Sequence, residues 1–169
     1  MRALLIAALA SLAVPMTAAA QTSAPCTSPE SRQFDFWVGK WEVFPAGHPD
    51  TKVADSLIET LYGNCAIREN WMPLKGPGGG SLNAWIPDKK TWRQTWLDVG
   101  GFADFTGGWN GTAMVIEGVW PQPGHPAQMT RMTYTPHTDG SVEQSGVTSD
   151  DGGKTWATSF DLIYIHPKS

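Results

Sequence analysis

The sequence contains few basic residues and no cluster of them. Lysine and arginine together number 12 against 16 aspartates and glutamates, which gives a net charge of −4 at pH 7. A mildly acidic chain without a basic patch has no electrostatic attraction for nucleic acid or for an anionic membrane surface. We therefore expect no nucleic-acid partner, and the composition does not specify an oligomeric state.

The motifs of several enzyme classes are also missing. No serine stands in a G-x-S-x-G sequence, and the glycines at 76–80 lack the lysine of a phosphate-binding loop. The four histidines have no metal-ligand spacing, so we expect no metal and no cofactor. His166, at the end of the last expected strand, is the candidate for a haem ligand, but a solvated terminal histidine is the simpler interpretation. Catalytic residues are therefore not identified by motif.

The first 20 residues carry one charge, Arg2. An apolar run at 3–14, too short to span a bilayer, is followed by Ala18, Ala19 and Ala20. This order is typical of a secretory signal peptide cleaved after Ala20. We therefore expect a periplasmic or secreted protein without a membrane anchor. A buried N-terminal helix is the alternative.

Cysteine is scarce, with only Cys26 and Cys65. In an oxidising compartment an even number of cysteines favours a disulfide. This bridge would close a loop of roughly 40 residues and contribute about 4 kcal/mol on the chain-entropy account. Two buried free thiols are the alternative.

Sustained helical periodicity is absent after Ser28, Pro29 and Glu30, which are typical of a helix start. Short runs rich in β-branched and aromatic residues follow, separated by glycine, proline, asparagine and aspartate. They predict strands at 36–43, 54–61, 66–71, 81–86, 92–99, 103–109, 113–119, 128–135, 142–148 and 157–165. About ten sequential strands predict an all-β fold, an antiparallel up-and-down barrel after a short N-terminal helical turn; a flattened sandwich is the alternative.

Three segments follow from these patterns: a signal peptide at 1–20, a leader with a helical turn at 21–33, and one barrel domain at 34–166. Two of the expected turns, Asn110-Gly111 and Asp139-Gly140, suit type I′ hairpins. The segment from Ser149 to Trp156 fits S-x-D-x-G-x-T-W and resembles the Asp-box turn of β-propellers. Only one copy is present, so we expect a hairpin turn and not a propeller.

Tryptophan, in contrast, is abundant, with nine residues. Strand alternation places several of them beside polar residues on one face: Glu69 with Trp71, Asn83 with Trp85, and Gln94 with Trp96 and Asp98. Such a face is typical of a cavity with a few polar groups. The expected ligand-binding residues are Trp37, Glu69, Trp71, Asn83, Trp85, Gln94, Trp96 and Asp98. The alternative is that the tryptophans cover the outer wall.

Gly39 and Trp41 form a Gly-x-Trp motif that resembles the start of lipocalins and related calycin barrels. In those barrels the tryptophan closes the floor, and a basic residue near the chain's end packs over it. Longer stretches at 34–41, 63–71, 81–83 and 92–98 resemble a family of exported bacterial proteins, a domain of unknown function regarded as a lipocalin-like barrel. This resemblance spans Phe34 to Tyr164 and implies the fold and export, but no activity. The last expected strand offers no arginine as a partner for Trp41.

Three functions agree with these patterns. The first is an exported barrel that binds a small, partly apolar molecule. The second is an enzyme, a hydrolase or isomerase, with Glu69 or Asp98 as acid or base, since a carboxyl group among tryptophans has a raised pKa. The third is a structural or interaction module with a filled core and an apolar outer patch.

Overall fold

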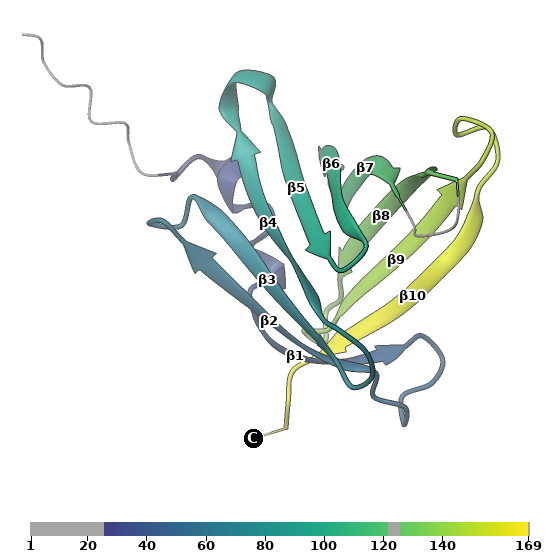
Figure 1. The fold of residues 1–169 in the computed structure, drawn as a ribbon. Helices are drawn as coiled ribbons and strands as arrows, with labels where there is room; N and C mark the ends of the chain where they lie inside the picture. Colours follow the sequence, from purple (N-terminus) through teal and green to yellow (C-terminus); the bar gives the residue numbers. More distant parts are fainter. Residues whose placement is uncertain (1–25, 122–125, 169) are drawn as a thin grey trace, which may run out of the picture.

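The computed structural model describes residues 26–121 and 126–168, so the predicted signal peptide lies outside the described residues. Ten antiparallel strands follow one another around a closed barrel (Figure 1). They are β1 Gly39–Pro45, β2 Ala54–Leu61, β3 Ala66–Pro73, β4 Gly79–Ile86, β5 Thr91–Asp98, β6 Gly101–Trp109, β7 Met114–Trp120, β8 Gln128–Pro136, β9 Val142–Ser149 and β10 Ala157–Ile165. Each strand pairs with the next, and β10 pairs with β1. The predicted all-β barrel is confirmed, and the flattened sandwich is wrong.

The first strand begins later than expected. Residues predicted as its start form the 3₁₀-helix η2, Asp35–Trp37, in which the Val38 N–H donates to Asp35 O at 3.0 Å. This turn directs Trp37 into the barrel, where its ring stacks on Phe34 at 5.0 Å between centroids. Both rings are fully buried. An aromatic run that looks like a strand in sequence therefore forms part of the barrel floor.

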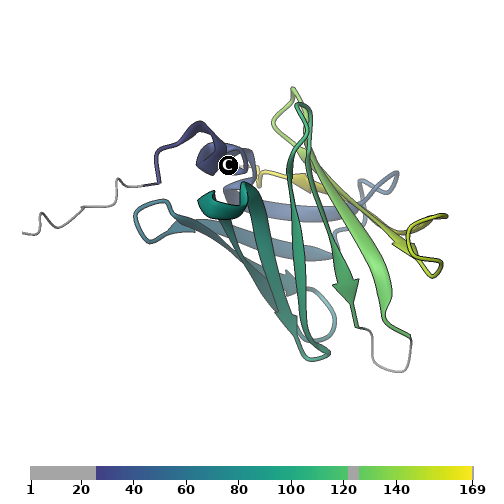
Figure 2. The same cartoon turned by 90° about the horizontal axis from the view of Figure 1, so that it is seen from above.

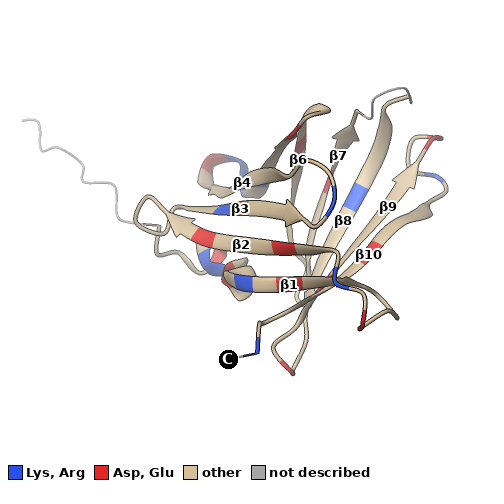
Figure 3. Cartoon of the chain, turned by 60° about the horizontal axis from the view of Figure 1, so that its bottom comes forward, with Lys and Arg blue, Asp and Glu red and all other residues tan. Residues whose placement is uncertain are grey.

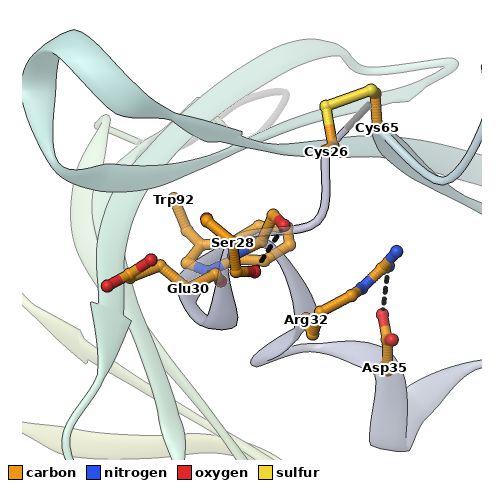
Figure 4. Close-up of polar contacts among 8 residues, drawn as sticks. Cys26, Ser28, Glu30, Arg32, Asp35, Cys65 and Trp92 are labelled. Carbon is orange, nitrogen blue, oxygen red and sulfur yellow. Dashed lines mark hydrogen bonds and ion pairs between the residues drawn. A yellow bond between two sulfur atoms is a disulfide. The ribbon is translucent and has the colours of Figure 1, made fainter. Parts of the chain in front are cut away.

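The predicted N-terminal helical turn is confirmed as the 3₁₀-helix η1, Pro29–Arg32. Ser28 is its N-cap, because its Oγ accepts the Ser31 N–H at 3.3 Å. The carbonyl of Glu30 accepts the indole N–H of Trp92, at the start of β5, at 3.1 Å (Figure 4). The leader is thus fastened to the wall of the barrel.

The predicted disulfide between Cys26 and Cys65 is confirmed, with 5.0 Å between the two Cα atoms (Figure 4). It joins the leader to the turn between β2 and β3. A disulfide is consistent with an extracellular or periplasmic location. The η1 turn lies at the end of the barrel where β2 ends and β3 begins (Figure 2).

The residues just before β1 close one end of the barrel. This end collects the starts of β1, β3, β5, β7 and β9. Phe34 packs there edge-on against Trp92 and Tyr134, at 5.7 and 5.0 Å between centroids. At the other end the cavity is lined by strand residues, such as Trp71, Trp96 and Trp120. The space inside the barrel therefore lies toward that second end.

The tryptophan of the Gly-x-Trp motif has a partner that the sequence does not suggest. His166, just after β10, stacks on Trp41 with 3.8 Å between ring centroids, and Trp41 Nε1 donates to Trp37 O at 2.8 Å. Gly39 provides the space, since a Cβ there would lie 2.9 Å from His166 Cε1. An imidazole ring thus occupies the place where the resemblance leads one to expect a basic side chain.

Two turn types differ from the prediction. Asn110 and Asp139 keep negative φ angles, and only Gly111 and Gly140 are positive, at +104° and +86°, so neither hairpin is type I′. The cause is local, because Asn110 Oδ1 accepts the Ala113 N–H and Asp139 Oδ1 accepts a hydroxyl and an amide of the same turn. Side-chain acceptors stabilise these turns in place of the expected backbone geometry.

The Asp-box-like turn between β9 and β10 is present as a hairpin. Asp151 accepts hydrogen bonds from the Lys154 and Thr155 amides, both at 2.9 Å. The hydrogen bonds from Thr155 lower the pKa of the Asp151 carboxyl group to about 2. Trp156 Nε1 donates to Gly153 O at 3.0 Å, and the Arg131 guanidinium lies 4.2 Å above its ring. These contacts account for the motif as a structural turn.

Charged residues are scattered over the described strands without a basic cluster (Figure 3). Several form ion pairs on the outer wall, such as Arg93 with Asp104 at 2.9 Å and Lys52 with Asp55 at 2.7 Å. No helix within residues 26–121 and 126–168 is long and apolar enough to cross a bilayer. The inner face of the barrel, in contrast, contains almost no charge.

Candidate functional site

A cavity of about 190 Å³ lies inside the barrel, toward the end opposite the leader. Its upper wall is aromatic and aliphatic, because the ends of β3, β5 and β7 and the start of β10 meet there. The side chains that form this wall are Trp71, Trp96, Trp120, Phe160 and Leu162. All five are only partly buried and pack against the core. The strand order therefore gathers three tryptophans from separate hairpins around one opening.

Glycines on the inner face make room for the rings of this wall. A Cβ at Gly79 would lie 2.6 Å from Cζ2 of Trp96, and a Cβ at Gly146 would overlap the ring of Phe160. Each glycine lies on the strand next to its ring. Any larger residue at either position would collide with the neighbouring ring, so glycine is required for the rings to occupy these places.

The floor of the cavity is polar, and its central group is Glu69. This side chain is only 4% exposed, although it is a carboxyl group. Ser56 Oγ donates to Oε1 at 3.3 Å, and Ser81 Oγ donates to Oε2 at 3.1 Å. The two serines lie on the strands that flank β3, so the register itself supplies both donors.

Amide and phenol groups form the rest of the floor. Gln94 Nε2 donates to Asn83 Oδ1 at 2.7 Å and to the Tyr134 hydroxyl at 3.1 Å. Gln144 Nε2 donates to the same hydroxyl at 3.0 Å, and the Tyr164 hydroxyl donates to Gln144 Oε1 at 2.5 Å. The network connects five strands across the barrel and leaves few of its polar groups without a partner.

Burial controls the protonation of this floor. Desolvation raises the pKa of Glu69 from its ordinary 4.5 to about 7, although contacts with Ser81, Ser56 and Tyr164 oppose the rise. Desolvation, together with the nearby negative charge of Glu69, also raises the pKa of Tyr134 and of Tyr164, which stay neutral at ordinary pH. Near pH 7 the cavity therefore contains one carboxyl group that is about half ionised.

Four of the eight predicted ligand-binding residues line the cavity: Glu69, Trp71, Gln94 and Trp96. The structure places the other four elsewhere. Asn83 lies below the floor and donates to Ile67 O and Ser81 Oγ. Trp37 is in the closed end, 4.8 Å from the ring of Tyr134. Trp85 borders a groove beside Cys26 and Cys65 at that same end. The strand alternation assigned these side chains to the correct faces of their strands. The residues lie, however, at different positions along the axis of the barrel.

Asp98 is the fourth of these residues, and it lies at the rim. Its Oδ2 accepts the Trp96 indole N–H at 2.8 Å, and its Oδ1 accepts the Gly100 N–H at 2.7 Å. It does not line the cavity with Glu69. Its contacts position a tryptophan of the wall and shape the turn between β5 and β6.

Sequence reasoning missed the lining residues from the second half of the chain. They are Trp120, Met132, Tyr134, Gln144, Phe160, Leu162 and Tyr164. Alternation within the expected strands could have found part of this set, since 132 and 134 share one face, as do 160, 162 and 164. The predicted site depends on strands with a tryptophan and a polar residue on the same face. The inner faces of β8, β9 and β10 contain no such pair.

The site offers one ionisable carboxyl group in an aromatic cavity, together with neutral hydrogen-bonding groups. His166 does not line the cavity, because it stacks on Trp41 at the opposite end of the barrel. Across residues 26–121 and 126–168, no group of three His, Cys, Asp or Glu side chains is placed to hold a metal ion. Comparison with protein-family models and with curated proteins finds no match to this chain.

Proposed function

We propose that this protein binds a small, partly apolar molecule in the cavity of the barrel. The observation that carries the proposal is the cavity itself, with an aromatic wall above a polar floor. Binding sites for small molecules are concave, mostly apolar and supplied with a few placed polar groups. A module with a filled core would have no such space.

The size of the cavity limits the ligand. An engineered cavity of roughly 150 Å³ in another protein binds benzene. The 190 Å³ found here is slightly larger. It suits one ring with one or two substituents, or an aliphatic molecule of similar volume. A long fatty acid would extend far beyond the rim.

We further propose that the protein is exported and related to the family of lipocalin-like exported barrels whose stretches it resembles. The closed barrel, the disulfide and the stacked Trp41 support this proposal. Mass spectrometry of the protein expressed with residues 1–20 tests export directly. Processing after Ala20 supports the proposal, and an uncleaved cytoplasmic product contradicts it.

Binding is tested with a panel of neutral and charged single-ring compounds, observed through the tryptophan indole N–H signals in NMR. We expect saturable shifts of the Trp71 and Trp120 signals with at least one compound. Leu162→Trp fills the cavity and should abolish these shifts. Leu97→Trp makes the same change on the outer wall, where Leu97 is 61% exposed, and should retain them. No saturable shift with any compound at millimolar concentration would contradict the proposal.

An enzyme is the second candidate, and the observation that favours it is the pKa of about 7 for Glu69. A carboxyl group with this pKa suits general acid or base chemistry near neutral pH. Its predicted partner Asp98 is engaged at the rim, so any such chemistry would depend on Glu69 alone. A Glu69→Gln protein that retains full turnover of a substrate found by screening excludes this role.

A further inference from the structure

We propose that the ligand of this cavity is a small protonated organic amine with an apolar ring or chain, whose ammonium group pairs with the Glu69 carboxylate. The inference rests on the proposed binding function and adds the chemical class of the ligand. Three independent features of the cavity support it: its charge, its hydrogen-bond donors and its aromatic faces.

The charge of the cavity has one sign. Glu69 is the only charged residue among the eleven that line it, and no lysine, arginine or histidine is among them. An anionic ligand would meet a buried carboxylate without any compensating cation, which is strongly unfavourable at low dielectric. A cationic ligand would instead supply the counter-charge that the protein does not provide.

The donors of the floor are already used within the protein. Both hydrogens of the Gln94 amide are directed to Asn83 and Tyr134. The Gln144 amide donates to Tyr134 and to the sulfur of Met132, and its oxygen accepts the Tyr164 hydroxyl. A carboxylate has about four lone-pair positions, and the contacts of Glu69 with Ser56, Ser81 and Tyr164 leave at least one of them free. The free capacity at the floor is therefore for accepting hydrogen bonds, and an ammonium group donates them.

The wall supplies aromatic faces around the same space. Trp71 lies 6.3 Å from Tyr164, and Trp96 meets Trp120 edge-on at 6.0 Å between centroids. Their faces carry partial negative charge and attract ammonium groups, the interaction used by aromatic cages. An aromatic enclosure above one buried carboxylate is complementary to an ammonium ion that carries apolar carbon.

The protonation of Glu69 gives this inference a thermodynamic signature. The titratable groups that act on Glu69 from the facing strands are Tyr134 and Tyr164, and both remain neutral. A bound cation stabilises the carboxylate form, so binding near or below pH 7 releases a proton from Glu69. With a permanent cation, affinity should rise about 100-fold between pH 5 and pH 9, as expected for a single group with a pKa of about 7.

The experiment compares benzylamine with benzyl alcohol, which share shape but differ in charge at pH 7.5, by isothermal titration calorimetry on the full protein. We expect benzylamine to bind wild-type protein at least tenfold more tightly than benzyl alcohol. Glu69→Gln should remove this preference while benzyl alcohol still binds. Glu59→Gln on the neighbouring strand makes the same change on the outer wall, where Glu59 pairs with Arg68, and should change neither affinity.

The outcomes separate the two levels of the proposal. If benzyl alcohol binds as tightly as benzylamine and Glu69→Gln alters neither, the amine inference is wrong and the binding function stands. If neither ring compound binds, the amine inference is wrong, and the binding function is decided by the compound panel described above. Should Glu69→Gln fail to fold, the pH series with phenyltrimethylammonium on wild-type protein decides: an affinity independent of pH between 5 and 9 overturns the inference.

Discussion

Replacing Glu69 by glutamine should stabilise the empty protein at alkaline pH. The carboxyl group has a pKa of about 7 in the folded state against an ordinary 4.5, so between these values the folded state binds more protons than the unfolded state. Folding stability therefore falls as pH rises through this window. The difference of about 2.5 pKa units corresponds to about 3 kcal/mol. Glutamine keeps the shape, its Oε1 can accept one serine hydroxyl while its Nε2 donates to the other, and it carries no charge to desolvate.

The measurement is urea unfolding of both proteins at several pH values from 4 to 9 without ligand. Subtracting one stability from the other at each pH cancels the titration of all other groups. We expect the advantage of Glu69→Gln to be near zero at pH 4, to grow between pH 4.5 and 7, and to level off above pH 7. Glu59→Gln removes a carboxyl group that pairs with Arg68 on the outer wall, and it should not reproduce the gain of stability at alkaline pH. A difference that is constant over the whole range would refute the assigned burial and pKa of Glu69.

Two further predictions concern the frame of the barrel. Converting Cys26 and Cys65 to serine should lower the free energy of unfolding by about 4 kcal/mol, because the bridge spans 39 positions of chain. Urea unfolding of the wild type and of this variant without reductant checks this. Equal unfolding midpoints would contradict it. Gly146→Ala should cost about 1–3 kcal/mol, since its Cβ would overlap the Phe160 ring, whereas Gly108→Ala meets nothing within 4 Å and should be neutral. A Phe160→Leu background should reduce the cost of Gly146→Ala, and a cost that is unchanged there would assign it to another contact.

The ten strands could be predicted because their signals are local. The run at 54–61, for example, is bounded by turn residues and coincides with β2, Ala54–Leu61. The aromatic residues at 34–37 misled the prediction, because tryptophan and phenylalanine favour strands by propensity, while here burial in the floor selects a 3₁₀ turn. Turn chemistry at Asn110 and Asp139 was misjudged for a related reason, since side-chain acceptors replaced the expected backbone angles.

The candidate site could be predicted only in part, because alternation gives the face of a residue and not its height in the barrel. Glu69 and Asp98 both face inward by sequence, yet one lies at the buried floor and the other at the rim. Height depends on the register between paired strands, which places Glu69 level with Ser81 and Trp96, and Asp98 two residues nearer the rim. The same limit concealed the contact of Gln94 on β5 with Tyr134 on β8, which exists only once the sheet has closed.

The interior of this barrel has two parts. Buried side chains fill one end, and the cavity lies toward the other end. An eight-stranded barrel is about as wide as its side chains can fill, so ten strands leave surplus space. Phe34 and Trp37, which follow the leader, fill that space at one end, and glycines at the other end leave room for the rings of Trp96 and Phe160. Between the two lies Glu69, whose negative charge near neutral pH is opposed by burial and has no cationic partner among the lining residues. A group that weakens the empty fold at neutral pH is most simply explained if a cationic ligand offsets its charge, which is why the stability of Glu69→Gln and the binding of amines test the same feature from opposite sides.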